Sequence, residues 1–313
     1  MKKFKLIFFL IFILSYQIQA QQNIENNFSI TIKEGKLAGS FIASNNKANI
    51  VIIIAGSGPT DRNGNNPLGV AASSYKMLAN ELSKNNIASL RYDKRGVAES
   101  KVNNFKEKEL SFENYIDDAV LMYQYAKDSL GYKNIYFIGH SEGSLIGIIA
   151  SQNTKVKGFI SLSGAGKPID EVILNQLESQ PENIYQESAN ILKLLKEGKE
   201  TDDVPQYLYS LFRPSVQPYM ISWIKYNPVN EIKKLSVPVL IINGSCDVQV
   251  KPEEAQLLYM ANTKNKVVII KNMTHTLKNT SDDCDDSSME TYTNESLPLN
   301  KELVDEVVKF INH

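Results

Sequence analysis

The sequence predicts an α/β protein with a mostly parallel, doubly wound sheet. From residue 49 onward, short apolar runs rich in β-branched residues alternate with segments of helical apolar spacing. The run at 50–54 is apolar at every position, as expected of a parallel strand that is buried on both faces. A chain of 313 residues with 42% hydrophobic content can bury a core of the size that such a sheet requires.

The predicted elements follow one another in a regular order. Two short runs at 28–33 and 37–42 flank a turn at 34–36 and predict an N-terminal antiparallel hairpin. Further strand patterns occur at 50–54, 87–92, 134–139, 156–162, 237–243 and 266–270. Helices are expected directly after residue 139 and at 75–82, 112–126, 252–260 and 301–311.

The first twenty residues predict a signal peptide. Residues 1–5 contain three lysines, residues 6–14 form an unbroken apolar run, and a more polar stretch ends at Ala20. The apolar run is too short to span a bilayer comfortably, so we expect export to the periplasm or the medium, without a stable membrane span. An uncleaved N-terminal anchor is the alternative.

A long interruption of the strand pattern predicts an inserted helical cap at 165–235. Because the insertion separates two core strands, we expect it over the carboxyl edge of the sheet, with 21–164 and 236–313 forming the core. The alternative is a second structural layer whose aromatic side chains only fill a small core. The aromatic residues of this segment include Tyr185, Tyr207, Tyr209, Phe212, Tyr219, Trp223 and Tyr226.

Composition and cysteine count limit the classes of function. A formal net charge of −1 creates no field that would gather nucleic acid, so no nucleic-acid partner is expected. Cys246 and Cys284 lack the spacing of zinc ligands, and no metal or organic cofactor is expected. The two cysteines can form a disulfide in an oxidising compartment or remain unrelated thiols, and the sequence leaves both possibilities open. It also leaves the oligomeric state open.

The strongest local signal is a Gly-x-Ser-x-Gly pattern at 139–143, between a predicted strand and a predicted helix. Such a tight turn gives the central residue strained backbone angles, and glycine at either side avoids collisions. The strain exposes the hydroxyl of Ser141, and the helix behind it supplies free N–H groups and a partial positive charge. Ser141 is therefore the candidate nucleophile.

A serine nucleophile requires a base, and the chain has three histidines. His140 adjoins Ser141, so its side chain is expected to point elsewhere, and His313 is the last residue. His275 follows a predicted strand and is the candidate base. Asp247 follows the strand at 237–243 and is the candidate acid, and the chain order Ser, Asp, His fits the α/β-hydrolase arrangement.

The oxyanion that forms during acyl transfer requires backbone N–H donors. One candidate is the N–H group of Glu142, the residue after the nucleophile. The glycine-rich loop after the strand at 50–54 would supply the second donor, for which Ser57 is the best candidate.

At these residues the chain resembles the EstD-like carboxylesterases, a group close to the serine aminopeptidase (S33)-like α/β hydrolases. The resemblance spans most of residues 28–313 and is weakest in the cap. It is carried by the segments GSGPTDRNG at 56–64, RYDKRGVAES at 91–100, GHSEG at 139–143 and GSCDVQV at 244–250, and by the segment around His275.

The resemblance also bears on residues outside the triad. Ala98 stands where the family usually has glycine, which concerns the geometry of that turn and not catalysis. Asp61, Asp93 and Arg95 are expected to hold loops through buried hydrogen bonds, without a catalytic role.

The family likeness and the aromatic cap favour a small-molecule substrate, a carboxylic ester with a short to medium acyl chain. Activity should fall on the acid side of about pH 6–7 as His275 gains a proton. One alternative is an aminopeptidase whose cap carboxylates pair with a substrate amine, with Glu171, Glu178, Glu182 and Glu187 as candidates. Another is a non-catalytic binding protein that keeps the fold.

Overall fold

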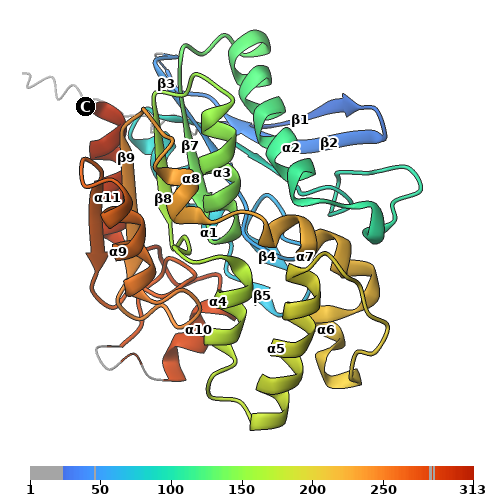
Figure 1. Ribbon diagram of the computed structural model, residues 1–313. Coiled ribbons are helices and arrows are strands. Elements are labelled where there is room, and N and C mark those ends of the chain that lie inside the picture. The colour runs from blue at the N-terminus through green and yellow to red at the C-terminus, as the bar shows by residue number, and fades with distance from the viewer. Residues whose placement is uncertain (1–23, 46, 282–283, 285) are drawn as a thin grey trace, which may run out of the picture.

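The computed structural model describes residues 24–45, 47–281, 284 and 286–313, and it has an α/β architecture (Figure 1). The predicted signal peptide at 1–20 lies outside these residues. Eight strands form one sheet in the order β1-β2-β6-β3-β7-β8-β9-β10. The pairs β1–β2 and β2–β6 are antiparallel, and every other neighbouring pair in this sheet is parallel. The predicted parallel sheet and its N-terminal hairpin are thus confirmed.

The strands of this sheet end close to the predicted positions. Strand β8 begins two residues later than the pattern indicated, at Gly158. The sequence did not predict a second, two-stranded hairpin of β4 and β5. The strand bounds are β1 Glu25–Ile32, β2 Gly35–Ile42, β3 Asn49–Ile54, β4 Asn65–Asn66, β5 Val70–Ala71, β6 Ala88–Tyr92, β7 Asn134–His140, β8 Gly158–Leu162, β9 Val239–Gly244 and β10 Lys266–Ile270.

Helices connect the parallel strands and cover both faces of the sheet (Figure 1). The longer helices outside the insertion are α1 Ser74–Lys84, α2 Phe112–Gln124, α3 Glu142–Gln152, α9 Pro252–Ala261 and α11 Lys301–Asn312. A π-helical turn, Tyr125–Ser129, extends α2. The remaining short elements there are the 3₁₀ turns Glu107–Glu109 and Asp286–Met289 and the helix α10 Glu290–Thr293.

Alternate residues of the parallel strands enter two separate apolar cores, because successive strand side chains point to opposite faces. In β3, Ile50, Ile52 and Ile54 pack in the same core as α2, α3 and α9. Val51 and Ile53 pack in the other core with α1 and α11. This two-sided burial explains why the strand at 50–54 is apolar throughout.

The insertion at 165–235 is helical in the structure and has no strand among its residues, all of which are described. It contains α4 Ile169–Gln176, α5 Glu182–Lys196, α6 Tyr209–Phe212, α7 Gln217–Ile224 and α8 Pro228–Ile232, with 3₁₀ turns at Gln206–Leu208 and Pro214–Val216. In Figure 1, α4, α5, α6 and α7 lie together at one end of the sheet. Their buried apolar side chains belong to the same core as α2 and α3, so the division into core and cap at residues 165 and 235 stays a prediction.

The cap aromatics contribute mainly to this core. Trp223 stacks on Phe112 of α2 with ring centroids 5.5 Å apart, and Tyr219 lies edge-on to Tyr115 at 5.7 Å. Phe212 is fully buried. Phe212, Tyr219 and Trp223 therefore fill the core that the insertion shares with α2, whereas Tyr207 and Tyr209 are exposed. The choice between a cap and a second structural layer stays a prediction.

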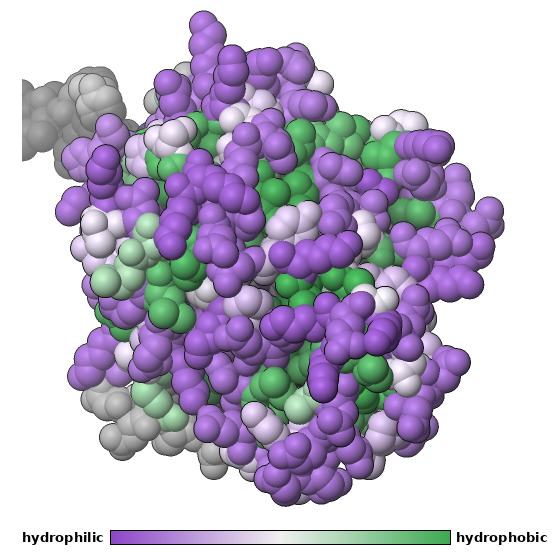
Figure 2. Space-filling model, in the orientation of Figure 1, coloured by the Kyte–Doolittle hydropathy of each residue, from purple (hydrophilic) through white to green (hydrophobic). Residues whose placement is uncertain are grey.

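The visible surface is mostly hydrophilic. Figure 2 shows apolar side chains in smaller groups between polar ones on this face of the molecule. Within the described part of the chain, no helix has the length and apolar character needed to cross a membrane.

Candidate active site

The carboxyl ends of neighbouring parallel strands bring the candidate residues to one edge of the sheet. Ser141 follows β7, Ser57 lies in the loop after β3, and β3 and β7 are adjacent. Asp247 follows β9 and His275 follows β10, which also pair with each other. The chain therefore places all four residues above the same edge, as the strand-end positions predicted.

The Ser141 turn has the strained geometry expected of a nucleophile elbow. Ser141 has φ 54° and ψ −121°, a region that costs a non-glycine residue about 1–3 kcal/mol. A Cβ atom on Gly139 would lie 2.1 Å from the carbonyl oxygen of Gly143, and one on Gly143 would lie 2.4 Å from that of Ile54. Both glycines are required by close backbone contact, and α3 begins directly after the nucleophile.

Asp247 and His275 form a buried hydrogen-bonded pair. His275 Nδ1 lies 3.0 Å and 2.9 Å from the two carboxylate oxygens of Asp247. The carboxylate also accepts hydrogen bonds from the N–H groups of Gln249 and Val250. Burial opposes ionisation of Asp247, but its contacts with His275 and Val250 outweigh it and hold the pKa below the usual value. Since Nδ1 donates to an ionised carboxylate, Nε2 of the neutral ring has a free lone pair.

Ser141 and His275 line one pocket of about 200 Å³, together with Ser57 and His140. Among the described residues, no hydrogen bond joins the Ser141 hydroxyl to His275. The structure thus assembles the candidate acid–base pair and places the candidate nucleophile in the pocket that His275 lines. Contacts between nucleophile and base are commonly long without a substrate and shorten when one is bound.

The two candidate oxyanion donors flank the nucleophile. A Cβ atom on Gly56 would lie 3.3 Å from Ser141 Cβ, so the loop before Ser57 approaches the elbow closely. Glu142 is the first residue of α3, where N–H groups lack partners within the helix. Within the described part of the chain, the N–H groups of Ser57 and Glu142 donate no hydrogen bond.

Comparison with known proteins finds relatives among hydrolases and esterases. Residues 68–207 match the family model for serine aminopeptidase, S33. Esterase EstD of Thermotoga maritima is 28% identical over 260 residues, which cover 79% of this chain and 56% of that protein. The chain thus spans little more than half the length of this curated relative.

Solved structures with the same fold include two esterase-type proteins from other organisms. Est1E of Butyrivibrio proteoclasticus with bound ferulic acid has a TM-score of 0.61 at 18% identity, covering 91% of this chain and 98% of that one. The esterase Pf2001 of Pyrococcus furiosus has a TM-score of 0.60 at 18% identity, covering 92% and 91%. The chain has the α/β-hydrolase fold.

His140 is part of the candidate site in a way that the sequence did not predict. Its Nε2–H donates to the carbonyl oxygen of His275 over 2.8 Å, so its Nδ1 accepts from the hydroxyl of Tyr75 over 2.7 Å. The same hydroxyl oxygen accepts the N–H of Gly56 over 3.0 Å. This chain of hydrogen bonds connects the loop before Ser57 with the loop of the candidate base.

His140 is expected to remain neutral across the physiological pH range. Burial, with a smaller contribution from the neighbouring His275, lowers the pKa of His140 to about 3. In ¹H–¹⁵N NMR spectra of histidine-labelled protein, its ring signals should show the Nε2–H tautomer and should not move between pH 5 and 8. Movement with a midpoint near pH 6.5 would contradict the hydrogen-bond chain.

The same lowered pKa affects stability. Below about pH 6.5 the unfolded chain binds a proton at this histidine and the folded chain does not. His140 therefore stabilises the fold above this pH, and the contribution decreases as the pH falls toward 3, by at most about 1.4 kcal/mol per pH unit. Urea unfolding at pH 7 and pH 5 should show this loss in the wild type, and a smaller one in His140→Gln.

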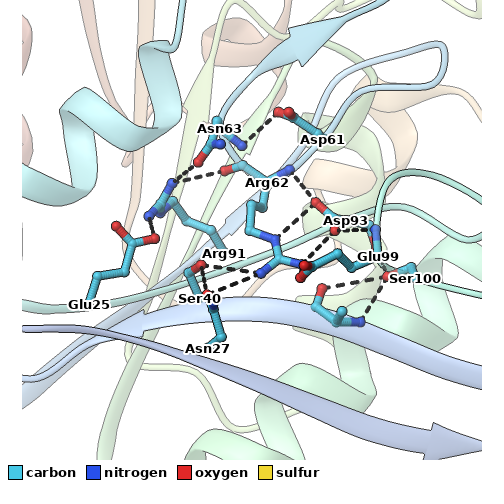
Figure 3. Close-up of polar contacts among 11 residues, drawn as sticks. Glu25, Asn27, Ser40, Asp61, Arg62, Asn63, Arg91, Asp93, Glu99 and Ser100 are labelled. Atoms are coloured by element: carbon cyan, nitrogen blue, oxygen red, sulfur yellow. Dashed lines mark hydrogen bonds and ion pairs between the residues drawn. The ribbon is translucent and has the colours of Figure 1, made fainter.

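The rest of the loop after β3 is held by buried charged groups (Figure 3). Asp93 accepts hydrogen bonds from the backbone N–H and the guanidinium of Arg62, at 2.6 to 3.1 Å. Arg91 donates to Asn63 and to the carbonyl oxygen of Arg62. One oxygen of Asp61 accepts two N–H groups within the loop. The loop-holding roles expected for Asp61 and Asp93 are confirmed.

Two further expectations concern the strand-end segment at 91–100. Arg95 pairs with the buried carboxylate of Asp118 and does not contact the triad. Ala98 adopts φ 44°, so this turn keeps the left-handed conformation that favours glycine.

A disulfide joins Cys246 and Cys284, whose Cα atoms lie 5.1 Å apart. The structure thus decides the question that the sequence left open. The closed loop contains both Asp247 and His275. A sequence separation of 38 residues corresponds to about 3–4 kcal/mol of stabilisation in the chain-entropy treatment.

The cap carboxylates that could recognise an amine do not line the pocket of Ser141. Glu178 lines a different pocket, of about 350 Å³. Gln249 lines both pockets and donates to the hydroxyl of Tyr292. Glu187 accepts a hydrogen bond from the exposed Tyr207.

Proposed function

We propose that this chain is a serine hydrolase that cleaves carboxylic esters of short to medium acyl chains through an acyl-enzyme on Ser141. The observation that carries the proposal is the buried Asp247–His275 pair beside a strained serine elbow. The N–H groups of Ser57 and Glu142, which donate to no other described residue, also support it.

Each residue has a defined role in this mechanism. His275 removes the proton of the Ser141 hydroxyl through Nε2 while the oxygen attacks the ester carbonyl, and Asp247 stabilises the imidazolium that forms. The N–H groups of Ser57 and Glu142 donate to the oxyanion. His275 then protonates the leaving alcohol, and water hydrolyses the acyl-enzyme by the reverse route.

The small size of the pocket favours a short acyl group. Its volume of about 200 Å³ lies below the range of 300–1,000 Å³ that is common for drug-sized ligands. No cap aromatic residue lines it in the described structure, so the sequence-based argument from an aromatic cap does not support the ester assignment. The support comes from the pocket and from the relatives, two of which carry the name esterase.

A serine aminopeptidase remains the second candidate, because the family model that matches residues 68–207 bears that name. The described residues that line the pocket include no carboxylate for such a substrate. Its polar lining consists of hydroxyl, amide and imidazole groups, among them Thr60, Asn66 and Gln249. An ammonium group would have no negative partner there, which disfavours this candidate.

A substrate panel separates the candidates. We expect p-nitrophenyl acetate and butyrate to be hydrolysed fastest, p-nitrophenyl octanoate more slowly, and alanine and proline arylamides slowest. Ser141→Ala supplies the background rate for every substrate. Faster turnover of the arylamides would replace the esterase proposal by the aminopeptidase. No turnover, together with failure of a fluorophosphonate probe to label the protein, would favour a non-catalytic binding protein.

We also propose that the protein is exported to the periplasm or the medium. The pattern of residues 1–20 and the Cys246–Cys284 disulfide support this, because disulfides persist in oxidising compartments. Mass spectrometry of the secreted chain should find Gln21 as the first residue, and retention of the full leader in the cytoplasm would contradict export.

A further inference from the structure

We propose that Lys94 is a positioning residue of the oxyanion hole. It holds the peptide between Gly56 and Ser57 in the orientation that directs the Ser57 N–H group toward the oxyanion. The inference rests on the proposed function, since it assigns a role within the same acyl transfer.

The Lys94 side chain is buried beside the elbow, with 5% of its surface exposed. Its ammonium group donates to the carbonyl oxygen of Gly56 over 3.1 Å and to the carboxylate of Glu142 over 2.7 Å. It also lies 4.1 Å from the ring centroid of Tyr115. One cation thus contacts both segments that supply the oxyanion donors.

The geometry of the peptide unit gives the contact with Gly56 its importance. The carbonyl oxygen of Gly56 and the N–H of Ser57 belong to one planar trans peptide and point in opposite directions. A donor that fixes the oxygen therefore also fixes the direction of the N–H group. Glycine allows this peptide to rotate more freely than another residue would, so the orientation requires an external contact.

Gly56 is held on its other side as well. Its own N–H donates to the hydroxyl oxygen of Tyr75, which is bound to His140. Burial raises the pKa of Tyr75, so this hydroxyl remains protonated and can donate to His140. Tyr75 and Lys94 together fix the two peptide units that flank Gly56.

The charge of Lys94 adds an electrostatic effect to the orientation. A cation on the carbonyl oxygen polarises the peptide and strengthens its N–H group as a donor, and the effect is larger in a buried site. The carboxylate of Glu142, whose side chain is 1% exposed, balances the charge. Removing Lys94 alone would leave this carboxylate buried without its cation, which destabilises a fold.

The alternative is that Lys94 only neutralises Glu142. Two variants separate the roles. Lys94→Met removes the cation and keeps the length of the side chain, and Lys94→Met/Glu142→Gln also removes the unbalanced charge. If neutralisation is the only role, the double variant should recover wild-type activity. If Lys94 positions the peptide, the double variant should fold stably and remain slow.

The matched control is Arg95→Met. It removes the cation next to Lys94 in the chain, which pairs with the buried carboxylate of Asp118. This pair does not contact the triad, so the variant should keep its rate on esters within a few-fold of the wild type. Thermal unfolding of all four proteins shows which of them are folded under the assay conditions.

The readout is specific to the oxyanion. The Ser141 oxygen adds to the carbonyl carbon of a butyl trifluoromethyl ketone. The hydroxyl proton moves to His275, and the carbonyl oxygen of the ketone becomes an oxyanion. We expect both Lys94 variants to lose about 10²-fold in kcat on p-nitrophenyl butyrate, with KM changed less than threefold. Their inhibition constants for the ketone should rise by at least tenfold.

The possible outcomes distinguish the two proposals. If the wild type is active and the double variant has the kcat and the ketone affinity of the wild type, the role of Lys94 is overturned. The esterase proposal then remains intact. An equal loss in Arg95→Met would also overturn it, since the effect would then be general. A folded wild type that neither hydrolyses the ester nor binds the ketone would overturn the proposed function, and the role of Lys94 with it.

Discussion

Ser141→Ala is expected to lower kcat on p-nitrophenyl butyrate by a factor on the order of 10⁶. The substitution removes the oxygen that forms the acyl-enzyme, while the oxyanion donors and the pocket remain. Alanine keeps the Cβ atom, so it retains the strained backbone of the elbow and adds no new collision. The variant should therefore fold like the wild type, and a fluorophosphonate probe should no longer label it.

A buried serine of α3, the helix that follows Ser141, provides the control. Ser144 lies one turn further along, and its hydroxyl bonds to that of Ser161 over 2.7 Å. Ser144→Ala should keep the rate within about tenfold, because it loses a neutral hydrogen bond outside the pocket. If both variants lost activity equally, the loss would reflect damage to the elbow, and Ser141 would not be assigned as the nucleophile.

The sequence predicted the position of the site because that position follows from topology. The carboxyl ends of parallel strands meet at one edge, so three strand-end residues had to approach one another once the strands were recognised. The elbow is a local feature, and its glycines are required by contacts within a few residues. Ser141, Asp247 and His275 could therefore be named as candidates from the sequence alone.

The contacts of Lys94, Tyr75 and His140 could not be predicted in the same way. Each depends on which buried side chain of one segment reaches the backbone of another, and periodicity does not encode this. The segment at 91–100 marked Lys94 only as part of a strand-end motif. The chemical reason for a lysine there emerges from its contacts with Gly56 and Glu142.

The packing partners of the cap aromatics could not be predicted for a related reason. An amphipathic pattern shows that one face of a helix is buried and does not show what buries it. Trp223 and Tyr219 face α2 and not the pocket. The cysteine pairing was left open because it depends on the distance between two loops, which the sequence does not give.

Asp247→Asn is expected to lower kcat by about 10⁴-fold while the protein remains folded. The amide oxygen of asparagine can still accept the N–H groups of Gln249 and Val250, so the turn after β9 keeps its hydrogen bonds. Toward His275, however, the amide can donate to Nδ1 and hold the proton on Nε2. The Nε2–H group of His275 would then point toward Ser141 as a donor, so the ring could not accept the hydroxyl proton.

The control for Asp247→Asn is Asp170→Asn in the cap. Asp170 is also buried and ion-paired, with Lys196 at 2.7 Å, and it does not line the pocket. The Asp170→Asn variant should lose about as much stability as Asp247→Asn. Its kcat should stay within a few-fold of the wild-type value. Measuring kcat beside the unfolding free energy of both variants separates the electrostatic role from packing. An Asp247→Asn protein of near wild-type kcat would show that another group orients His275, and the triad would be reduced to a pair.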